Sequence, residues 1–147
     1  MTRAEAWFLH ASTLLVGATG LVYGWMRYFA TSDDPFSLVD HPQQPLLRDL
    51  HIVFAPLLVF ACGVVWLGHI WVRVRSDFPT RRRTGVLLAC LVAPMIASGY
   101  LLQVTIDETW KTVWIWLHVA SSLGWTAGLV VHLLTRRGTP ARADAGV

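Results

Sequence analysis

The sequence predicts an all-α, membrane-embedded four-helix bundle, and three observations support that prediction. Of the 147 residues, 54% are hydrophobic and 14% are charged, whereas roughly 25% are charged in a soluble domain. Four apolar runs are each long enough to cross the hydrocarbon layer, which takes about 20 residues of helix. The composition therefore excludes an ordinary soluble domain, and it excludes a disordered chain, which needs low hydrophobicity and high charge.

We expect the spans at residues 6–30, 50–74, 85–104 and 113–135, within one membrane domain covering residues 1–147. The runs are too long and unbroken for the alternating strands of a membrane barrel. An open sheet would leave backbone groups unpaired in lipid. The first run follows a basic residue, as a signal peptide does, but its apolar stretch exceeds the core of about 7–15 residues that such peptides have. We therefore expect it to be kept as a span.

The connecting segments differ in composition. Residues 31–49 hold three prolines and four aspartates, which predicts a loop. Residues 75–84 are short and basic, residues 105–112 predict a short acidic turn, and the tail after Thr135 is basic and then small and polar. We find no internal repeat in the sequence. Cys62 and Cys90 lie inside apolar runs, and we expect both to be buried thiols.

The distribution of charge predicts the orientation of the chain. Three of the twelve basic residues, Arg27, Arg48 and Lys111, fall at one end of the spans, and the other nine fall at the opposite end. Because basic segments stay in the cytoplasm, both termini are predicted to be cytoplasmic and the acidic loops to face outward, across a bacterial inner membrane. The excess of basic residues is then explained by the orientation of the chain in the membrane lipid, and we expect no nucleic-acid partner.

Histidines are the most informative residues. Five of the six lie within the predicted spans, where an unpaired polar ring is costly and is a functional candidate by default. Almost no carboxylate or thiolate accompanies them at membrane depth. Imidazoles alone suit a metal whose charge a macrocycle already neutralises, and haem iron held by two axial histidines meets that demand.

The spacing of the histidines predicts two ligand pairs. His118 and His132 are 14 residues apart, which is about 21 Å along a helix, and fourteen steps of about 100° return both rings to nearly one face. One helix can therefore offer a ligand to each of two haems at different depths. His51 matches the depth of His118 at the outer end, and His10 matches that of His132 at the inner end.

His69 leaves the inner pair open. It follows His51 by 18 residues, five full turns of α-helix, so it is predicted to share the same face. It could replace His10 as the partner of His132, although the 18 residues span about 27 Å and would require a more tilted helix. We favour His10, and we then expect His69 to contact a haem propionate or to line a quinone pocket. His41, in the proline-rich loop, is expected to be solvated.

Other residues each have two interpretations. Gly17 and Gly24 follow His10 at seven-residue steps, so they would either admit a flat macrocycle or serve ordinary helix packing. Pro94 is expected to bend the third span. The cations near the span ends would either pair with haem propionates or extend their charged groups toward the interface. These cations are Arg27, Arg48 and Lys111 on the outer side and Arg73 and Arg75 on the inner side.

This arrangement resembles the di-haem cytochrome b subunits of membrane-bound formate dehydrogenases and nickel-iron hydrogenases. The resemblance covers roughly residues 6–135, and FLH at residues 8–10 and WLHVASSLGWTAGLVVHLL at residues 116–134 carry it. It implies two haem b groups, the outer on His51 and His118 and the inner on His10 and His132. It also implies a subunit that passes electrons between quinone and a redox partner, a dehydrogenase, hydrogenase or cytochrome.

The chain departs from that family in two ways. It lacks the longer loops and tail that usually hold the partner subunit, and it carries the additional His69. Two other functions stay open: a haem-free protein, either an assembly subunit or a metal-ion carrier, and a quinone-linked or ferric-type reductase that acts alone. We find no acid–base pair, nucleophile or phosphate loop. Any activity is therefore expected to be oxidoreductive, and the chain to be an electron-transfer subunit of an oxidoreductase complex.

Overall fold

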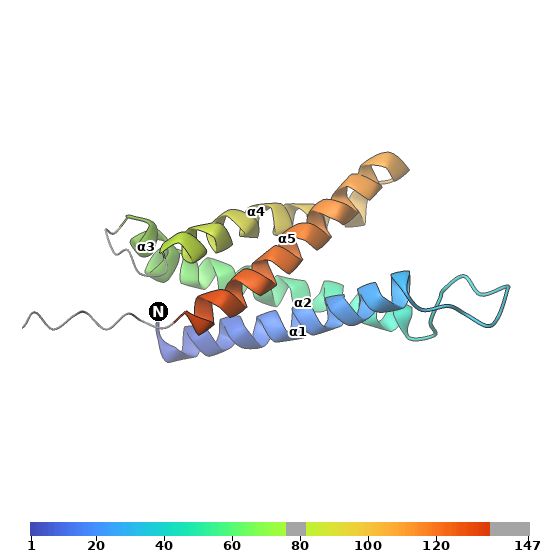
Figure 1. Ribbon diagram of the computed structural model, residues 1–147, viewed down its shortest axis with the longest axis horizontal. Helices are drawn as coiled ribbons and strands as arrows, with labels where there is room; N and C mark the ends of the chain where they lie inside the picture. The colour runs from blue at the N-terminus through green and yellow to red at the C-terminus, as the bar shows by residue number, and fades with distance from the viewer. Residues whose placement is uncertain (76–81, 136–147) are drawn as a thin grey trace, which may run out of the picture.

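The computed structural model describes residues 1–75 and 82–135, and within them every regular element is helical (Figure 1). The predicted all-α four-helix class is therefore confirmed. The elements in chain order are α1 (Arg3–Tyr28), α2 (Gln44–Val65), the π-helix η1 (Trp66–Trp71), α3 (Val72–Arg75), α4 (Arg82–Val104) and α5 (Glu108–Leu134).

Four helical stretches are long and apolar enough to cross a membrane: Arg3–Tyr28, Gln44–Trp71, Arg83–Val104 and Glu108–Leu134. The chain is accordingly a multi-pass membrane protein. Each of the four helices begins before its predicted span, because hydropathy finds only the part that lies in hydrocarbon. Residues 44–49 and 108–112, predicted to be loop and turn, are the first turns of α2 and α5. Residues 76–81 and the tail beyond residue 135 lie outside the described residues.

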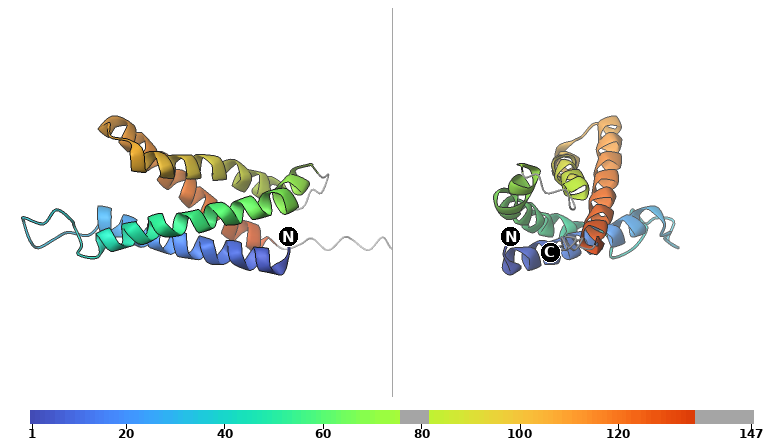
Figure 2. Two further views of the ribbon diagram at one scale, coloured as in Figure 1. Left: turned by 180° about the vertical axis from the view of Figure 1, so that it is seen from behind. Right: turned by 60° about the vertical axis from the view of Figure 1, so that its left-hand side comes forward.

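The helices form two antiparallel hairpins. α1 packs along α2, and α4 packs along α5. In Figure 1, α5 crosses the other helices obliquely and ends beside the start of α1. Both views of Figure 2 also show the end of α5 beside the start of α1. The last turns of α5 and the first turns of α1 therefore lie at the same end of the bundle.

Polar residues at the helix ends explain where α1 and α5 begin. The Thr2 hydroxyl accepts the Glu5 backbone N–H at 3.2 Å, and the Glu5 carboxylate accepts the Thr2 N–H at 2.8 Å, which makes a reciprocal capping box. Asp107 caps α5 by accepting the Trp110 N–H at 2.9 Å. These side chains satisfy backbone donors that lipid could not.

Two helices contain internal prolines, Pro56 in α2 and Pro94 in α4. Each proline lacks the N–H that would donate to the carbonyl one turn earlier. The Ser98 hydroxyl donates to the Pro94 carbonyl at 2.5 Å and lies within 3.2 Å of the Met95 carbonyl. Ser98 is fully buried. Its hydroxyl therefore has a partner inside the helix, as a polar group in a membrane bundle requires.

The two hairpins meet in one apolar cluster at the centre of the bundle. Val16, Leu58 and Cys62 from the first hairpin pack with Val92, Met95, Trp125 and Leu129 from the second. On α5 this cluster falls between His118 and His132, and on α2 between His51 and His69. Apolar packing therefore separates the two levels at which the histidines lie. Cys62 is buried as predicted, but the prediction for Cys90 is wrong, because its thiol is on the outward face of α4.

The end of the second span differs from its predicted geometry. Trp66–Trp71, which contains His69, is wound as a π-helix. A π-helix takes more residues per turn than an α-helix because its hydrogen bonds run from i to i+5. The prediction that His69 shares a face with His51 assumed uniform α-helical winding, from which this segment departs, so it stays a prediction.

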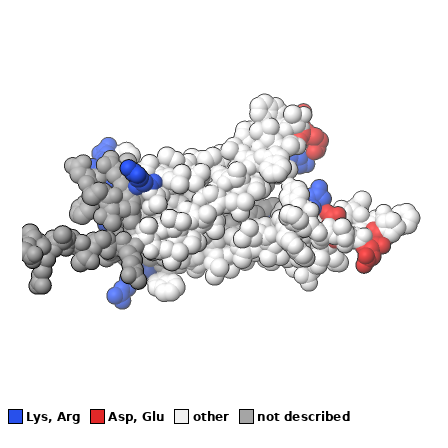
Figure 3. All heavy atoms as spheres, in the orientation of Figure 1, with Lys and Arg blue, Asp and Glu red and all other residues white. Residues whose placement is uncertain are grey.

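Charge is separated between the two ends of the bundle. Space-filling Figure 3 shows acidic side chains at one end of the bundle, where basic ones lie among them, and basic side chains alone at the other end of the visible face. The acidic end comprises residues 29–49 and 105–111. It contains six acidic residues, Asp33, Asp34, Asp40, Asp49, Asp107 and Glu108, against two basic ones.

Removing the central tryptophan should destabilise the bundle. Trp125 is 4% exposed and Trp116, on the same helix, is 69% exposed. We expect Trp125→Ala to cost about 3–5 kcal/mol because it opens a cavity between the hairpins. Trp116→Ala should cost far less. Thermal unfolding of both variants in the same detergent measures the difference, and equal unfolding temperatures would contradict the central position of Trp125.

Candidate functional site

His51 on α2 and His118 on α5 bring the two hairpins together near the acidic end. Their ring centroids are 6.1 Å apart and their planes are inclined by 76°. Both side chains are half-buried. His51 lies about two turns into α2 and His118 about three turns into α5, so both lie within the spanning part of their helices. The structure thus brings these two predicted site residues side by side.

Each ring is held by the helix that pairs with its own. Nδ1 of His51 lies 3.0 Å from the Val16 carbonyl on α1. Nδ1 of His118 lies 3.0 Å from the Met95 carbonyl on α4. A carbonyl oxygen only accepts, so both contacts require a proton on Nδ1. The neutral imidazole then has its free electron pair on Nε2, which is the nitrogen left to bind a metal.

The bundle core determines where these carbonyls lie. Val16 and Met95 are 9% and 7% exposed, and their side chains belong to the central cluster. The hydrogen bonds to the rings therefore start from backbone that tight packing has fixed. Neither Nε2 has a hydrogen-bond partner among the described residues, so both remain available to a ligand.

The spacing of the rings suits two axial ligands on one metal. A metal–imidazole bond is about 2.0–2.1 Å long, so two imidazoles on opposite sides of one metal have centroids roughly 6–6.5 Å apart. The observed 6.1 Å falls in that range. Within residues 1–75 and 82–135, no three His, Cys, Asp or Glu side chains gather closely enough to hold a bare ion.

Two donors fall short of the four that structural zinc takes and the six or more that calcium takes. Two donors do match the axial positions of an iron whose other four positions belong to a porphyrin. The donor set of His51 and His118 therefore fits haem better than it fits a bare divalent cation.

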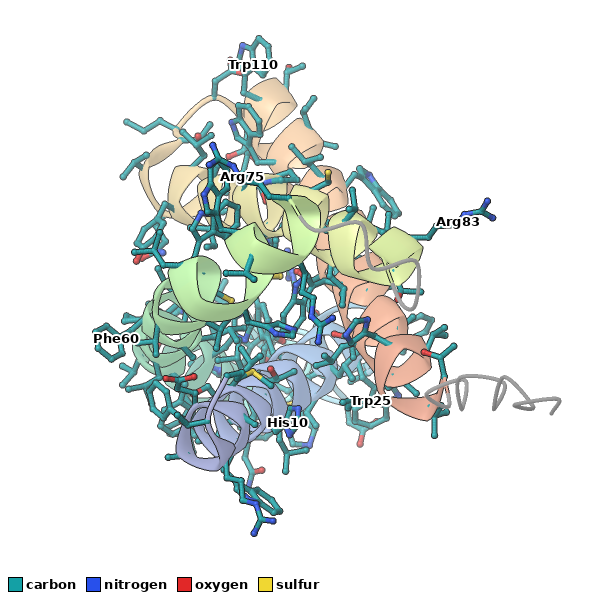
Figure 4. The ribbon with its side chains drawn as sticks, turned by 90° about the vertical axis from the view of Figure 1, so that its left-hand side faces the viewer. His10, Trp25, Phe60, Arg75, Arg83 and Trp110 are labelled. Atoms are coloured by element: carbon teal, nitrogen blue, oxygen red, sulfur yellow. The ribbon has the colours of Figure 1, made fainter. Side chains whose placement is uncertain are left out.

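The opposite end of the bundle holds the other histidines. Nδ1 of His132 lies 2.8 Å from the Thr84 hydroxyl at the start of α4. Figure 4 shows His10 on the side of α1 that faces α5, and the end of α5 carries His132. His10 and His69 are half-buried. Among the described residues, neither His10 nor His69 makes a ring-to-ring contact with His132, so the inner pair stays a prediction.

The predicted propionate partners at the acidic end all lie beside carboxylates. Arg27 is 3.6 Å from Asp40. Arg48 is 2.9 Å from Asp49, and Lys111 is 3.5 Å from Glu108. Such exposed pairs contribute little, so they leave the cations able to exchange partners.

At the basic end, the Arg75 guanidinium stacks over the Trp71 ring at 4.2 Å, and Arg73 is exposed. His41 accepts the Gln43 backbone N–H on its Nδ1 at 3.1 Å, a local contact within its loop. Neither the cation stack nor the loop contact reaches the His51–His118 pair.

The α1 glycine that contacts His51 is Gly20, which the sequence pattern did not single out. A Cβ on Gly17 or Gly24 would meet nothing within 4 Å, whereas a Cβ on Gly20 would lie 2.7 Å from Cε1 of His51. Likewise, a Cβ on Gly99 of α4 would lie 3.0 Å from Cε1 of His118. The identity of the facing glycine depends on how α1 packs against α2, which the periodicity of one helix does not contain.

Comparisons of the chain with protein family models, with curated proteins and with solved structures found no match. The functional assignment therefore depends on the geometry of the histidines and on the sequence pattern.

The hydrogen bonds predict the tautomers of three histidines. In the haem-free protein at a pH where its histidines are neutral, we expect His51 and His118 to carry the proton on Nδ1. His41 should carry it on Nε2, because its Nδ1 accepts a backbone N–H. ¹⁵N NMR of histidine-labelled protein distinguishes the two forms. A proton on Nε2 of His51 or His118 would contradict the geometry described above.

Proposed function

We propose that the protein is a di-haem b-type cytochrome that relays electrons across a membrane between a quinone pool and a redox partner. The observation that carries this proposal is the His51–His118 pair, with centroids 6.1 Å apart and with both Nδ1 atoms bonded to backbone carbonyls. The four spanning helices and the scarcity of charge at membrane depth support it further.

In this proposal, the residues at the acidic end bind the outer haem. His51 and His118 supply the axial Nε2 ligands, and the carbonyls of Val16 and Met95 orient both rings. Haem, when bound, supplies a one-electron couple at a site whose two axial positions are filled. The protein contributes position, exclusion of water and the electrostatic surroundings. Arg27 and Arg48, each already beside a carboxylate, are positioned for haem propionates at the membrane surface.

His132 supplies one ligand of the inner haem, held through the Thr84 hydroxyl. We keep His10 as its partner, because α1 begins beside the end of α5 and His10 lies on the side of α1 that faces α5. His69, which lies in the π-helix, is then a candidate for the quinone pocket or for a propionate contact. π-Helical segments are frequent at functional sites.

The separation of charge supports the orientation, with the basic end and both termini in the cytoplasm of a bacterium. A quinone would exchange electrons near the inner haem, as the family resemblance implies, and a partner protein would meet the outer face. The chain would then act as the electron-transfer subunit of an oxidoreductase complex in the inner membrane.

Counting haem in histidine variants tests the ligand assignment. We expect two haems per chain in the wild-type protein and one in His51→Ala, His118→Ala or His132→Ala, since each iron would lose an axial bond. His41→Ala should keep two. Haem per chain, from the pyridine haemochrome spectrum of purified protein, gives the count.

The other results of the haem count identify the inner ligand or contradict the proposal. Whichever of His10→Ala and His69→Ala lowers the count identifies the inner partner. Two haems in both His51→Ala and His118→Ala would contradict the outer pair. The absence of a b-type α-band in the wild-type protein would end the haem proposal and favour a metal-ion carrier or an assembly subunit.

The orientation has a separate test in cysteine labelling. Cys62 is buried, so a Cys90→Ser background leaves no exposed native thiol among the described residues. In that background we expect Ser37→Cys, in the exposed loop, to react with an impermeant maleimide on intact cells. Ala4→Cys, exposed near the N-terminus, should react only after lysis. The reverse pattern would contradict cytoplasmic termini.

A further inference from the structure

The two facing histidines are held by the same local arrangement, used twice. Residues 16–20 read VGATG and residues 95–99 read MIASG. In each, the first residue offers its carbonyl to a histidine Nδ1 at 3.0 Å. The fourth residue places a hydroxyl near that nitrogen, Thr19 at 3.5 Å and Ser98 at 3.3 Å. The fifth residue is the glycine against which the histidine ring packs.

The hydroxyls reinforce the direction of these hydrogen bonds. Thr19 donates its proton to the Leu15 carbonyl at 2.7 Å, and Ser98 donates to the Pro94 carbonyl. Because each hydroxyl proton is engaged within its own helix, a lone pair faces the ring nitrogen. Both segments therefore present only acceptors to Nδ1, and neither would hold a ring protonated on Nε2 alone.

The glycines bring each ring against the backbone of the neighbouring helix. A Cβ at Gly20 would lie 2.7 Å from Cε1 and 2.9 Å from Nδ1 of His51. A Cβ at Gly99 would lie 3.0 Å and 3.3 Å from the same atoms of His118. The distances at Gly20 are too short for a Cβ unless the His51 ring moves. The distances at Gly99 require a smaller displacement of the His118 ring.

The same dipeptide occurs once more in the chain. The sequence contains three Ser/Thr-Gly dipeptides, and each lies against a histidine. The third, Thr84-Gly85, places a hydroxyl 2.8 Å from Nδ1 of His132, and a Cβ on Gly85 would be 3.7 Å from Cε1 of that ring. These contacts single out His51, His118 and His132 from the remaining histidines of the chain.

We propose that Val16–Gly20 and Met95–Gly99 are positioning segments that hold the imidazole planes of His51 and His118 close to perpendicular on the outer haem. The inference rests on the proposed function. Each ring has one free rotation about its bond to iron, and the carbonyl and the glycine surface together fix that rotation. The 76° between the rings is the angle that the two segments set.

Perpendicular axial planes have a spectroscopic consequence that helix packing alone does not produce. They leave two iron d orbitals nearly equal in energy, and the ferric low-spin signal then has one very large g value. Parallel planes separate those orbitals and give three well-resolved g values. The electron paramagnetic resonance spectrum therefore measures the orientation that the segments impose.

The decisive comparison is Gly20→Ala against Gly63→Ala, an exposed position on the helix that carries His51. The Gly20 methyl would push a ring that its iron bond holds in place, so the ring must twist and lose its carbonyl bond. We expect the large-g signal of the outer haem to shift or split, its midpoint potential to rise as the ligand donates less, and haem binding to weaken about 10–100-fold. Gly63→Ala, whose methyl meets nothing within 4 Å, should match the wild type.

Gly99→Ala provides a second test in case Gly20→Ala does not fold, because a Cβ at Gly99 would lie farther from its histidine ring. We expect it to keep the helical content and to shift the same signal by a smaller amount. Two haems per chain with identical spectra in Gly20→Ala, Gly99→Ala and Gly63→Ala would overturn this inference and leave the proposed function standing. A wild-type protein without haem would overturn both.

Discussion

A hydrogen bond between a ring N–H and a helix carbonyl is the interaction on which the site depends. An imidazole in a membrane span needs a partner for each nitrogen, because lipid supplies none. In His51 and His118 the backbone of the paired helix takes Nδ1, and the other nitrogen is left for a metal. The carbonyls belong to Val16 and Met95, which the central cluster buries. The packing between the hairpins therefore also determines how the two histidine rings are oriented.

The arrangement of the bundle follows from that constraint. Each hairpin supplies both a ring and the surface that holds it, α1 for α2 and α4 for α5. The two rings then meet between the hairpins, where a planar group can be shared. The apolar cluster below them fixes the relative height of the helices and separates the outer level from that of His132. Among the described residues, charged side chains lie at the two ends of the bundle.

Much of this arrangement was predictable from the sequence because it depends on periodicity within single helices. Hydropathy located the four spans, and the depths of His51 and His118 followed from their positions in those spans. The facing glycine was not predictable in this way, since Gly17, Gly20 and Gly24 are equivalent until the packing of α1 on α2 is known. The π-helical winding of the segment that holds His69 was not predicted either, because it has no periodic signature in the sequence. The repeated segment escaped notice because the group that contacts each ring is a backbone carbonyl, an acceptor that every residue possesses.

The most direct test of the central claim is the near-infrared magnetic circular dichroism spectrum of the oxidised, purified protein, which reports the axial ligands of ferric haem. We predict a charge-transfer band typical of two imidazole ligands. In His118→Ala, the part of this band that comes from the outer haem should disappear. A band typical of histidine–methionine ligation, or an outer haem whose spectrum is the same in His118→Ala as in the wild type, would contradict the account.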